Sequence, residues 1–129
     1  AQVHFSESGD VLYAPPADQP AHFASMKSQV VRGNHRHDDP EKSVTDEVLV
    51  LLEGHIQFRI GDVTTNQYED HQFDIARIGI VALQFAADKC HAIKNLGEKT
   101  SWFASYYIRS KQVVKVTVDK QSCRLMLLV

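Results

Sequence analysis

The chain alternates between short apolar runs and short polar clusters along most of its length. The apolar runs are rich in Val, Ile, Leu, Phe and Tyr, and Gly, Asp, Asn or Pro separates them, which is typical of an all-β sandwich or barrel. No stretch keeps a 3.6-residue period over three turns, so no long helix is expected. The pattern predicts strands at 28–32, 47–52, 55–60, 71–75, 80–85, 91–94, 101–108, 113–118 and 124–129.

Turn residues and prolines predict how these strands are organised. Gly54 separates two strands at a tight turn, where glycine tolerates a positive φ. The polar stretch 63–70 (VTTNQYED) is expected to be a loop. Three of the four prolines lie in VLYAPPADQPAHF, which favours an extended arm or edge segment over residues 1–27. A chain of 129 residues without a linker or internal repeat suits a single domain, 1–129.

Composition excludes two classes of partner. Hydrophobic residues make up 43% of the chain, charged residues 23%, and the formal net charge is -2. A basic stripe is missing, so no nucleic-acid partner is expected. The longest apolar stretch, 78–87, falls far short of the roughly 20 residues that cross a bilayer, so no membrane partner is expected either. The chain begins at Ala1, which leaves earlier trimming open.

The two cysteines, Cys90 and Cys123, could form one disulfide bond. A small secreted scaffold normally carries more cysteines than this. We therefore expect two free thiols and a cytoplasmic location.

Three histidines and one glutamate form the candidate site. His35 and His37 are one residue apart, so on a strand they project from the same face. Glu47 opens a strand on the face of Leu49 and Leu51, where an isolated charge is costly and needs a cationic partner. His91 opens a later strand. Three imidazoles and a carboxylate would make a mixed site suited to Fe, Mn, Ni, Co or Zn.

These residues resemble the two sequence motifs of the cupin superfamily. The first motif has the form G-x5-HxH-x3–4-E-x6-G, and here His35 and His37 supply HxH, while Glu47 is followed by six residues and Gly54. The second has the form G-x5-PxG-x2-H-x3-N, to which Gly79, His91 and Asn95 correspond.

The resemblance covers about residues 30–107 and implies an all-β double-stranded β-helix, the jelly-roll barrel of cupins. It also implies a divalent metal in the barrel mouth. The implied ligands are His35, His37, Glu47 and His91.

The chain departs from the cupin motifs at three places. Nine residues, DDPEKSVTD, separate His37 from Glu47, so Glu41 competes for the ligand role. We favour Glu47 because the Glu-x6-Gly spacing is kept. Phe85-Ala86-Ala87 replaces the PxG turn, and Gly33 lies directly beside the histidine pair. The alternative is a metal-free barrel in which the same side chains contact a substrate.

Four further residues are candidates for substrate binding. Trp102 and Tyr106 share one face of a strand, and Phe103 and Tyr107 share the other. One pair is expected to line the lumen, with core packing as the alternative, and we take Trp102 and Tyr106 as the candidates. Arg32 could clamp a carboxylate or phosphate, or pair with the acidic loop instead. Asn95 completes the set.

The other four histidines match no ligand motif and are expected at the surface. They are His4, His22, His55 and His71.

Three functions remain open at this point. The first is a metal-dependent enzyme acting on a small organic molecule, whose reaction could be dioxygenation, isomerisation or decarboxylation. The second is a metal-independent nucleotide-sugar isomerase or epimerase, because VVRGNHRH and HAIKNLGE are similar to stretches of cupins from polysaccharide and nucleotide-sugar biosynthesis. The third is a non-catalytic cupin that binds a small ligand. The resemblance also implies a homodimer.

Overall fold

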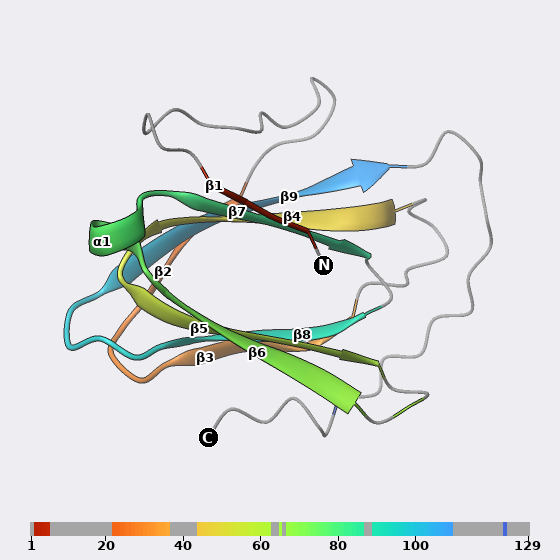
Figure 1. Ribbon diagram of the computed structural model, residues 1–129, viewed down its shortest axis with the longest axis horizontal. Helices are drawn as coiled ribbons and strands as arrows, with labels where there is room; N and C mark the ends of the chain where they lie inside the picture. Colours follow the sequence, from red (N-terminus) through yellow and green to blue (C-terminus); the bar gives the residue numbers. More distant parts are fainter. Residues whose placement is uncertain are drawn as a thin grey trace.

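The computed structural model describes residues 2–5, 22–36, 44–62, 65, 67–86, 89–109 and 123. These residues form two antiparallel sheets that face each other, with a one-turn helix, α1 (Ile75–Ile78), at one end (Figure 1). The all-β jelly-roll prediction is confirmed.

The five-stranded sheet has the order β1-β7-β4-β9-β2. Its strands are β1 (Gln2–Phe5), β7 (Val81–Ala86), β4 (Val44–Glu53), β9 (Ser101–Arg109) and β2 (His22–Met26). The four-stranded sheet has the order β3-β8-β5-β6. Its strands are β3 (Val31–His35), β8 (Cys90–Asn95), β5 (His55–Asp62) and β6 (Gln67–Asp74).

The main core lies between the two sheets because alternate residues of each strand point inward. Leu49 and Leu51 of β4 face inward, as do Ile56 and Phe58 of β5, and all four are buried. The outer face of the five-stranded sheet carries a second buried cluster that includes Val48. β4 and β5 therefore show the alternation that the sequence predicts. Both faces of β4 are apolar.

The turn at Gly54 is confirmed. Gly54 has φ of 115°, and a Cβ atom there would lie 2.5 Å from the Cβ of Ser101. Glycine is thus required both by the backbone conformation and by the close approach of β9.

One strand prediction and one loop prediction are wrong at their boundaries. The predicted strand 28–32 contains the turn between β2 and β3, where Gln29 has φ of 65°. The predicted loop 63–70 contains the start of β6, since Gln67 already pairs with Asp62. β6 is an edge strand, and its polar residues do not need the apolar alternation that marks a strand in the sequence. The predicted strands 113–118 and 124–129 lie outside the described residues.

The free-thiol prediction is wrong, because Cys90 and Cys123 form a disulfide bond. Both residues are buried, with Ala92, on the outer face of the four-stranded sheet. The two cysteines are 33 positions apart, and the fold brings them within bonding distance. This disulfide bond removes the reason for expecting a reducing cytoplasm. None of the described helices is long and apolar enough to cross a membrane.

Candidate active site

One row of inward-facing residues crosses both sheets at one end of the barrel. In the five-stranded sheet, Glu47 of β4 pairs with Phe85 of β7 on one side and with Tyr107 of β9 on the other. In the four-stranded sheet, His91 of β8 pairs with Ile60 of β5. Residues directly opposite in antiparallel strands share a face, so these five side chains form what we call the mouth row.

Glu47 and His91 meet across the gap between the two sheets. Nε2 of His91 lies 3.1 Å from Oε2 of Glu47, and the two side chains are only 4% and 5% exposed, respectively. His91 is therefore the partner of the buried Glu47 carboxyl group, and protonation of the imidazole makes the contact an ion pair. This contact ties β4 to β8, although the two strands belong to different sheets.

The other ring nitrogen of His91 faces the backbone. Nδ1 lies 3.3 Å from the carbonyl oxygen of Lys89. A carbonyl can only accept a hydrogen bond, so Nδ1 carries a proton and donates it. Nε2 then faces a carboxylate oxygen, and two acceptors at this distance require a proton or another cation between them. The ring also contacts Phe85, with 4.7 Å between the ring centroids.

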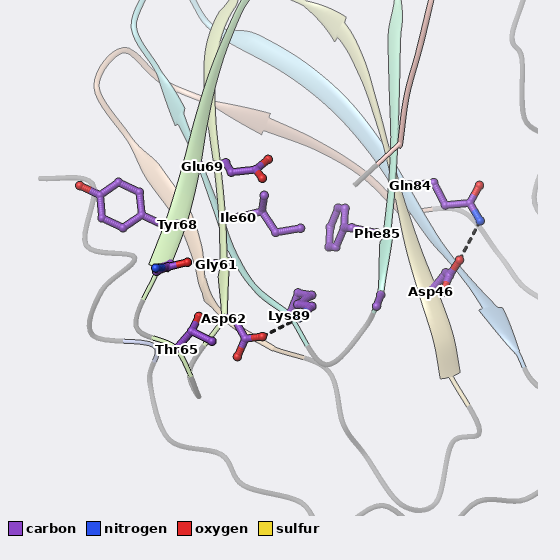
Figure 2. A pocket seen from close by; sticks show the side chains of 12 residues that line it. Asp46, Ile60, Gly61, Asp62, Thr65, Tyr68, Glu69, Gln84, Phe85 and Lys89 are labelled. Carbon is purple, nitrogen blue, oxygen red and sulfur yellow. Dashed lines mark hydrogen bonds and ion pairs between the residues drawn. The ribbon is translucent and has the colours of Figure 1, made fainter.

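A pocket of about 770 Å³ opens beside this pair. Figure 2 shows Ile60 and Phe85 facing each other in its centre, and these are the cross-strand neighbours of His91 and Glu47. The buried pair therefore lies immediately beside the inner wall of the pocket. Twelve residues line the pocket: Asp46, Ile60, Gly61, Asp62, Thr65, Gln67, Tyr68, Glu69, Gln84, Phe85, Ala86 and Lys89.

The charged groups of the described lining are mainly acidic. Three of them are carboxylates, those of Asp46, Asp62 and Glu69, and one is the ammonium of Lys89. Nζ of Lys89 lies 2.8 Å from Oδ2 of Asp62, and Nε2 of Gln84 donates to Asp46 over 2.7 Å (Figure 2). Such a lining favours a neutral or cationic ligand group over a phosphate.

Tyr107 adds a phenol to the mouth row. Its half-buried position raises the pKa of the hydroxyl, and the negative charge of Glu47 raises that pKa further. Tyr107 therefore keeps its proton at neutral pH and can donate it.

The predicted metal ligands are only partly described. The backbone of His35 pairs with His91 across β3 and β8, while the side chain of His35 lies outside the described residues. His37 and the competing Glu41 lie outside them as well. In the part of the chain that the structure describes, no three His, Cys, Asp or Glu side chains gather to hold a metal ion.

The donor pair itself suits a transition metal. An imidazole nitrogen and a carboxylate oxygen converge within 3.1 Å, and both are ligand types of such ions. The hydrogen bond from Nδ1 of His91 to a backbone carbonyl is the usual outer-shell support of a metal-binding histidine. The described part of the predicted set therefore fits a metal.

The prediction that Trp102 and Tyr106 line the lumen is wrong. Tyr106 packs on the outer face of the five-stranded sheet with Val48, and Trp102 is 47% exposed. The alternation was assigned correctly but the wrong pair was chosen, because both faces of β9 are apolar. Phe103 and Tyr107 are the inward-facing pair, since Phe103 belongs to the core between the sheets.

Asn95 has a structural role in place of the predicted ligand contact. It is fully buried, and its Nδ2 donates to the carbonyl oxygens of Met26 and Lys99. Its Oδ1 accepts from the backbone N–H of Gly97. These bonds hold the β8–β9 connection against β2, at the opposite end of the barrel from the mouth row.

Arg32 of β3 is exposed. It pairs in register with Ile93, and its guanidinium carbon lies 5.8 Å from the ring centroid of Phe103. Its Nη1 lies 3.5 Å from the carbonyl oxygen of Ser25. Arg32 is therefore held over the inner core, and it is not among the residues that line the pocket.

The remaining histidines divide as follows. His22 and His55 are exposed, as predicted. His71 is partly buried on the inner side of β6, where its Nε2 lies 3.4 Å from Glu69. The side chain of His4 is not described.

Sequence reasoning missed Ile60, Asp62, Phe85 and Lys89 as neighbours of the site. These residues are neighbours of the site because of how the strands pair, and no sequence motif encodes that register.

Comparison with known proteins agrees with the fold. No family model and no curated protein matches the chain. Solved structures do match, among them the capsular polysaccharide assembling protein CapF from Staphylococcus aureus, with 13% identity and a TM-score of 0.59 over 84% of this chain. A dTDP-4-dehydrorhamnose 3,5-epimerase from Elizabethkingia anophelis matches with 17% identity and a TM-score of 0.56 over 80% of this chain. The cupin domain of Drosophila melanogaster CENP-C matches with 12% identity and a TM-score of 0.54 over 68% of this chain.

The match spans 30% of the CapF chain, 52% of the epimerase chain and 59% of the CENP-C chain. At these identities the likeness is one of fold. Together with the two facing antiparallel sheets, it shows that the chain has the cupin fold.

Proposed function

We propose that Glu47 and His91 form an acid–base pair that moves protons on a small, hydroxyl-rich molecule, such as a sugar, bound in the barrel mouth. The observation that carries this proposal is the buried 3.1 Å contact between the two side chains beside the pocket. A buried imidazole and carboxylate that share a proton can take up or release that proton with little rearrangement.

The chemistry that suits this arrangement is epimerisation next to a carbonyl group. One member of the pair removes the proton from the carbon beside the carbonyl, and the bonding electrons move to the carbonyl oxygen to give an enolate. Return of a proton to the opposite face of that carbon completes the inversion. We assign this proton to Tyr107, the cross-strand neighbour of Glu47, which keeps its proton because burial and Glu47 raise its pKa.

Two observations support a sugar as the ligand. Two of the three matched proteins reported above are named for capsular polysaccharide assembly and sugar epimerisation. The pocket volume of about 770 Å³ lies within the roughly 300–1,000 Å³ of small-molecule sites. Because the described lining carries three carboxylates and one ammonium, we expect it to face the neutral sugar and not a diphosphate.

A divalent transition metal is the second candidate, favoured by the hydrogen bond from Nδ1 of His91 to the backbone. His91 and Glu47 would hold the ion, and His35 and His37 would complete the set that the sequence predicts. Fe, Mn, Ni, Co and Zn all suit these ligands. Such an ion would supply Lewis-acid polarisation of a substrate oxygen.

We also propose that the chain forms a homodimer through β2. Phe23 of β2 is 73% exposed and Trp102 of β9 is 47% exposed on the same outer face. Among the described strands β2 is the last of its sheet, and exposed aromatic residues beside a sheet edge favour association. Light scattering after size exclusion should give twice the monomer mass for the wild type and a lower mass for Phe23→Ser. A monomeric wild type would contradict this.

The proton-transfer proposal is tested by deuterium exchange. The purified chain is incubated in D₂O with dTDP-linked and free 4-keto-6-deoxy sugars, and NMR follows the proton beside the carbonyl. We expect exchange with the wild type and roughly 100-fold slower exchange with His91→Asn, as is typical for loss of a general acid or base. Glu53→Gln, an exposed carboxylate outside the site, is the control and should exchange normally.

The metal content of the same samples separates the two candidates. Exchange that is lost on chelation and restored by one metal supports the metal-dependent enzyme. Sugar binding without exchange in any sample contradicts both enzymes and leaves the non-catalytic binding protein.

A further inference from the structure

The residue directly before Cys90 holds the imidazole of His91 in its orientation. The carbonyl oxygen of Lys89 lies 3.3 Å from Nδ1 of His91. The position of this carbonyl holds the ring with Nδ1 toward the backbone and Nε2 toward Glu47. Whatever holds the backbone of Lys89 therefore influences the proposed acid–base pair.

The side chain of Lys89 is anchored on a different strand. Its Nζ lies 2.8 Å from Oδ2 of Asp62, at the end of β5, and Figure 2 shows this ion pair among the residues that line the pocket. The pair joins the start of β8 to the end of β5, next to the point where Gly61 pairs with Cys90. The connection runs from Asp62 through Lys89 to His91 and Glu47.

Exposure of this ion pair argues against a mainly stabilising role. The side chain of Lys89 is 40% exposed and that of Asp62 is 35% exposed. Ion pairs with this exposure contribute little to the free energy of unfolding. The contact between His91 and Glu47 is buried, with side chains 4% and 5% exposed, respectively. Its strength therefore depends much more on small changes of distance and orientation than that of the exposed ion pair.

We infer that Asp62 and Lys89 are positioning residues, whose ion pair fixes the Lys89 carbonyl and thereby keeps the Nδ1 proton of His91 in place. The effect on catalysis rests on the proposed function. The orientation of His91 does not, because it is present without a ligand. Neither residue needs to contact the reacting atoms.

The structure contains a matched control for this inference. Arg59 and Asp70 form an ion pair between β5 and β6 of the same sheet, with Nε of Arg59 2.6 Å from Oδ1 of Asp70. Arg59 follows the inward-facing Phe58, so this second pair lies on the outer face. Asp70→Asn removes an ion pair of the same sheet without touching the connection to His91.

The test measures the ring nitrogens of His91 by NMR in protein labelled with ¹⁵N-histidine and free of ligand. The His91→Asn variant assigns the signals. We expect the wild type and Asp70→Asn to show a protonated, hydrogen-bonded Nδ1. Asp62→Asn and Lys89→Met should weaken this hydrogen bond, so that the Nδ1 signal shifts and its proton exchanges faster with solvent. The charge-reversed pair Asp62→Lys with Lys89→Asp should restore the wild-type signal.

Unchanged His91 signals in both Asp62→Asn and Lys89→Met would overturn the inference. So would the same change of the Nδ1 signal in Asp70→Asn, because the effect would then belong to any ion pair of the sheet. This NMR measurement needs no sugar. If the proposed function fails, the measurement still tests the role of Asp62 and Lys89.

Discussion

The losses of unfolding free energy caused by replacing Glu47 and His91 singly should add up to more than the loss caused by replacing both together. Two opposite unit charges 3.1 Å apart attract with about 5 kcal/mol at an effective dielectric constant of roughly 20. Burying each charge costs several kcal/mol, so the net contribution of the intact pair is small. Removal of one partner leaves the other charge buried and uncompensated, which costs about 3–5 kcal/mol.

A double-mutant cycle measures this directly. Glu47→Met and His91→Leu keep approximately the side-chain volumes, and urea unfolding at neutral pH gives the free energy of unfolding for each variant and for the double variant. We expect the double variant to be more stable than the sum of the single effects predicts, by about 2–3 kcal/mol. Single effects that add up to the double effect within about 0.5 kcal/mol would refute a coupled buried pair.

The remaining predictions concern other parts of the barrel. Cys90→Ser together with Cys123→Ser should lower the free energy of unfolding by about 3–4 kcal/mol, from the loop entropy of a bond that spans 33 positions, and unchanged urea unfolding would contradict this. Arg59 lowers the pKa of the Asp70 carboxyl, so the pair should stabilise the fold above the ordinary carboxyl pKa of about 3.8 and lose this as pH falls through the lowered pKa. The stability difference between wild type and Asp70→Asn should therefore shrink from at most about 1 kcal/mol at neutral pH toward zero in acid, and a constant difference would contradict it. Asn95→Ala should lower the melting temperature by removing three hydrogen bonds and should leave sugar affinity unchanged in the folded protein, so a specific loss of affinity would restore its role as a ligand contact.

The apolar strands were predictable because their alternation is strong. β5 is buried at Ile56, Phe58 and Ile60, and this period of two is visible in the sequence. β6 was missed in part because an edge strand with polar residues lacks that period. The turn at Ser28 and Gln29 was missed because it contains neither glycine nor proline.

The residues of the candidate site that belong to a sequence motif were predictable. Glu47 was recovered because a carboxylate on an apolar strand face needs a partner, and His91 because the cupin spacing identifies it. Lys89 and Asp62 could not be found in this way, since their proximity arises from the pairing of β5 with β8. The disulfide was missed for the same reason, because a distance across the fold is not written in the spacing of two cysteines.

The measurement that tests the central claim most directly compares deuterium uptake in chelator-treated wild type and His91→Asn. With a 4-keto-6-deoxy sugar as substrate, the proposed acid–base pair predicts uptake by the metal-free wild type and roughly 100-fold less by the variant. Circular dichroism must show that both proteins are folded. Equal uptake by the two proteins would contradict the role of His91, and so would the lack of any uptake by the wild type.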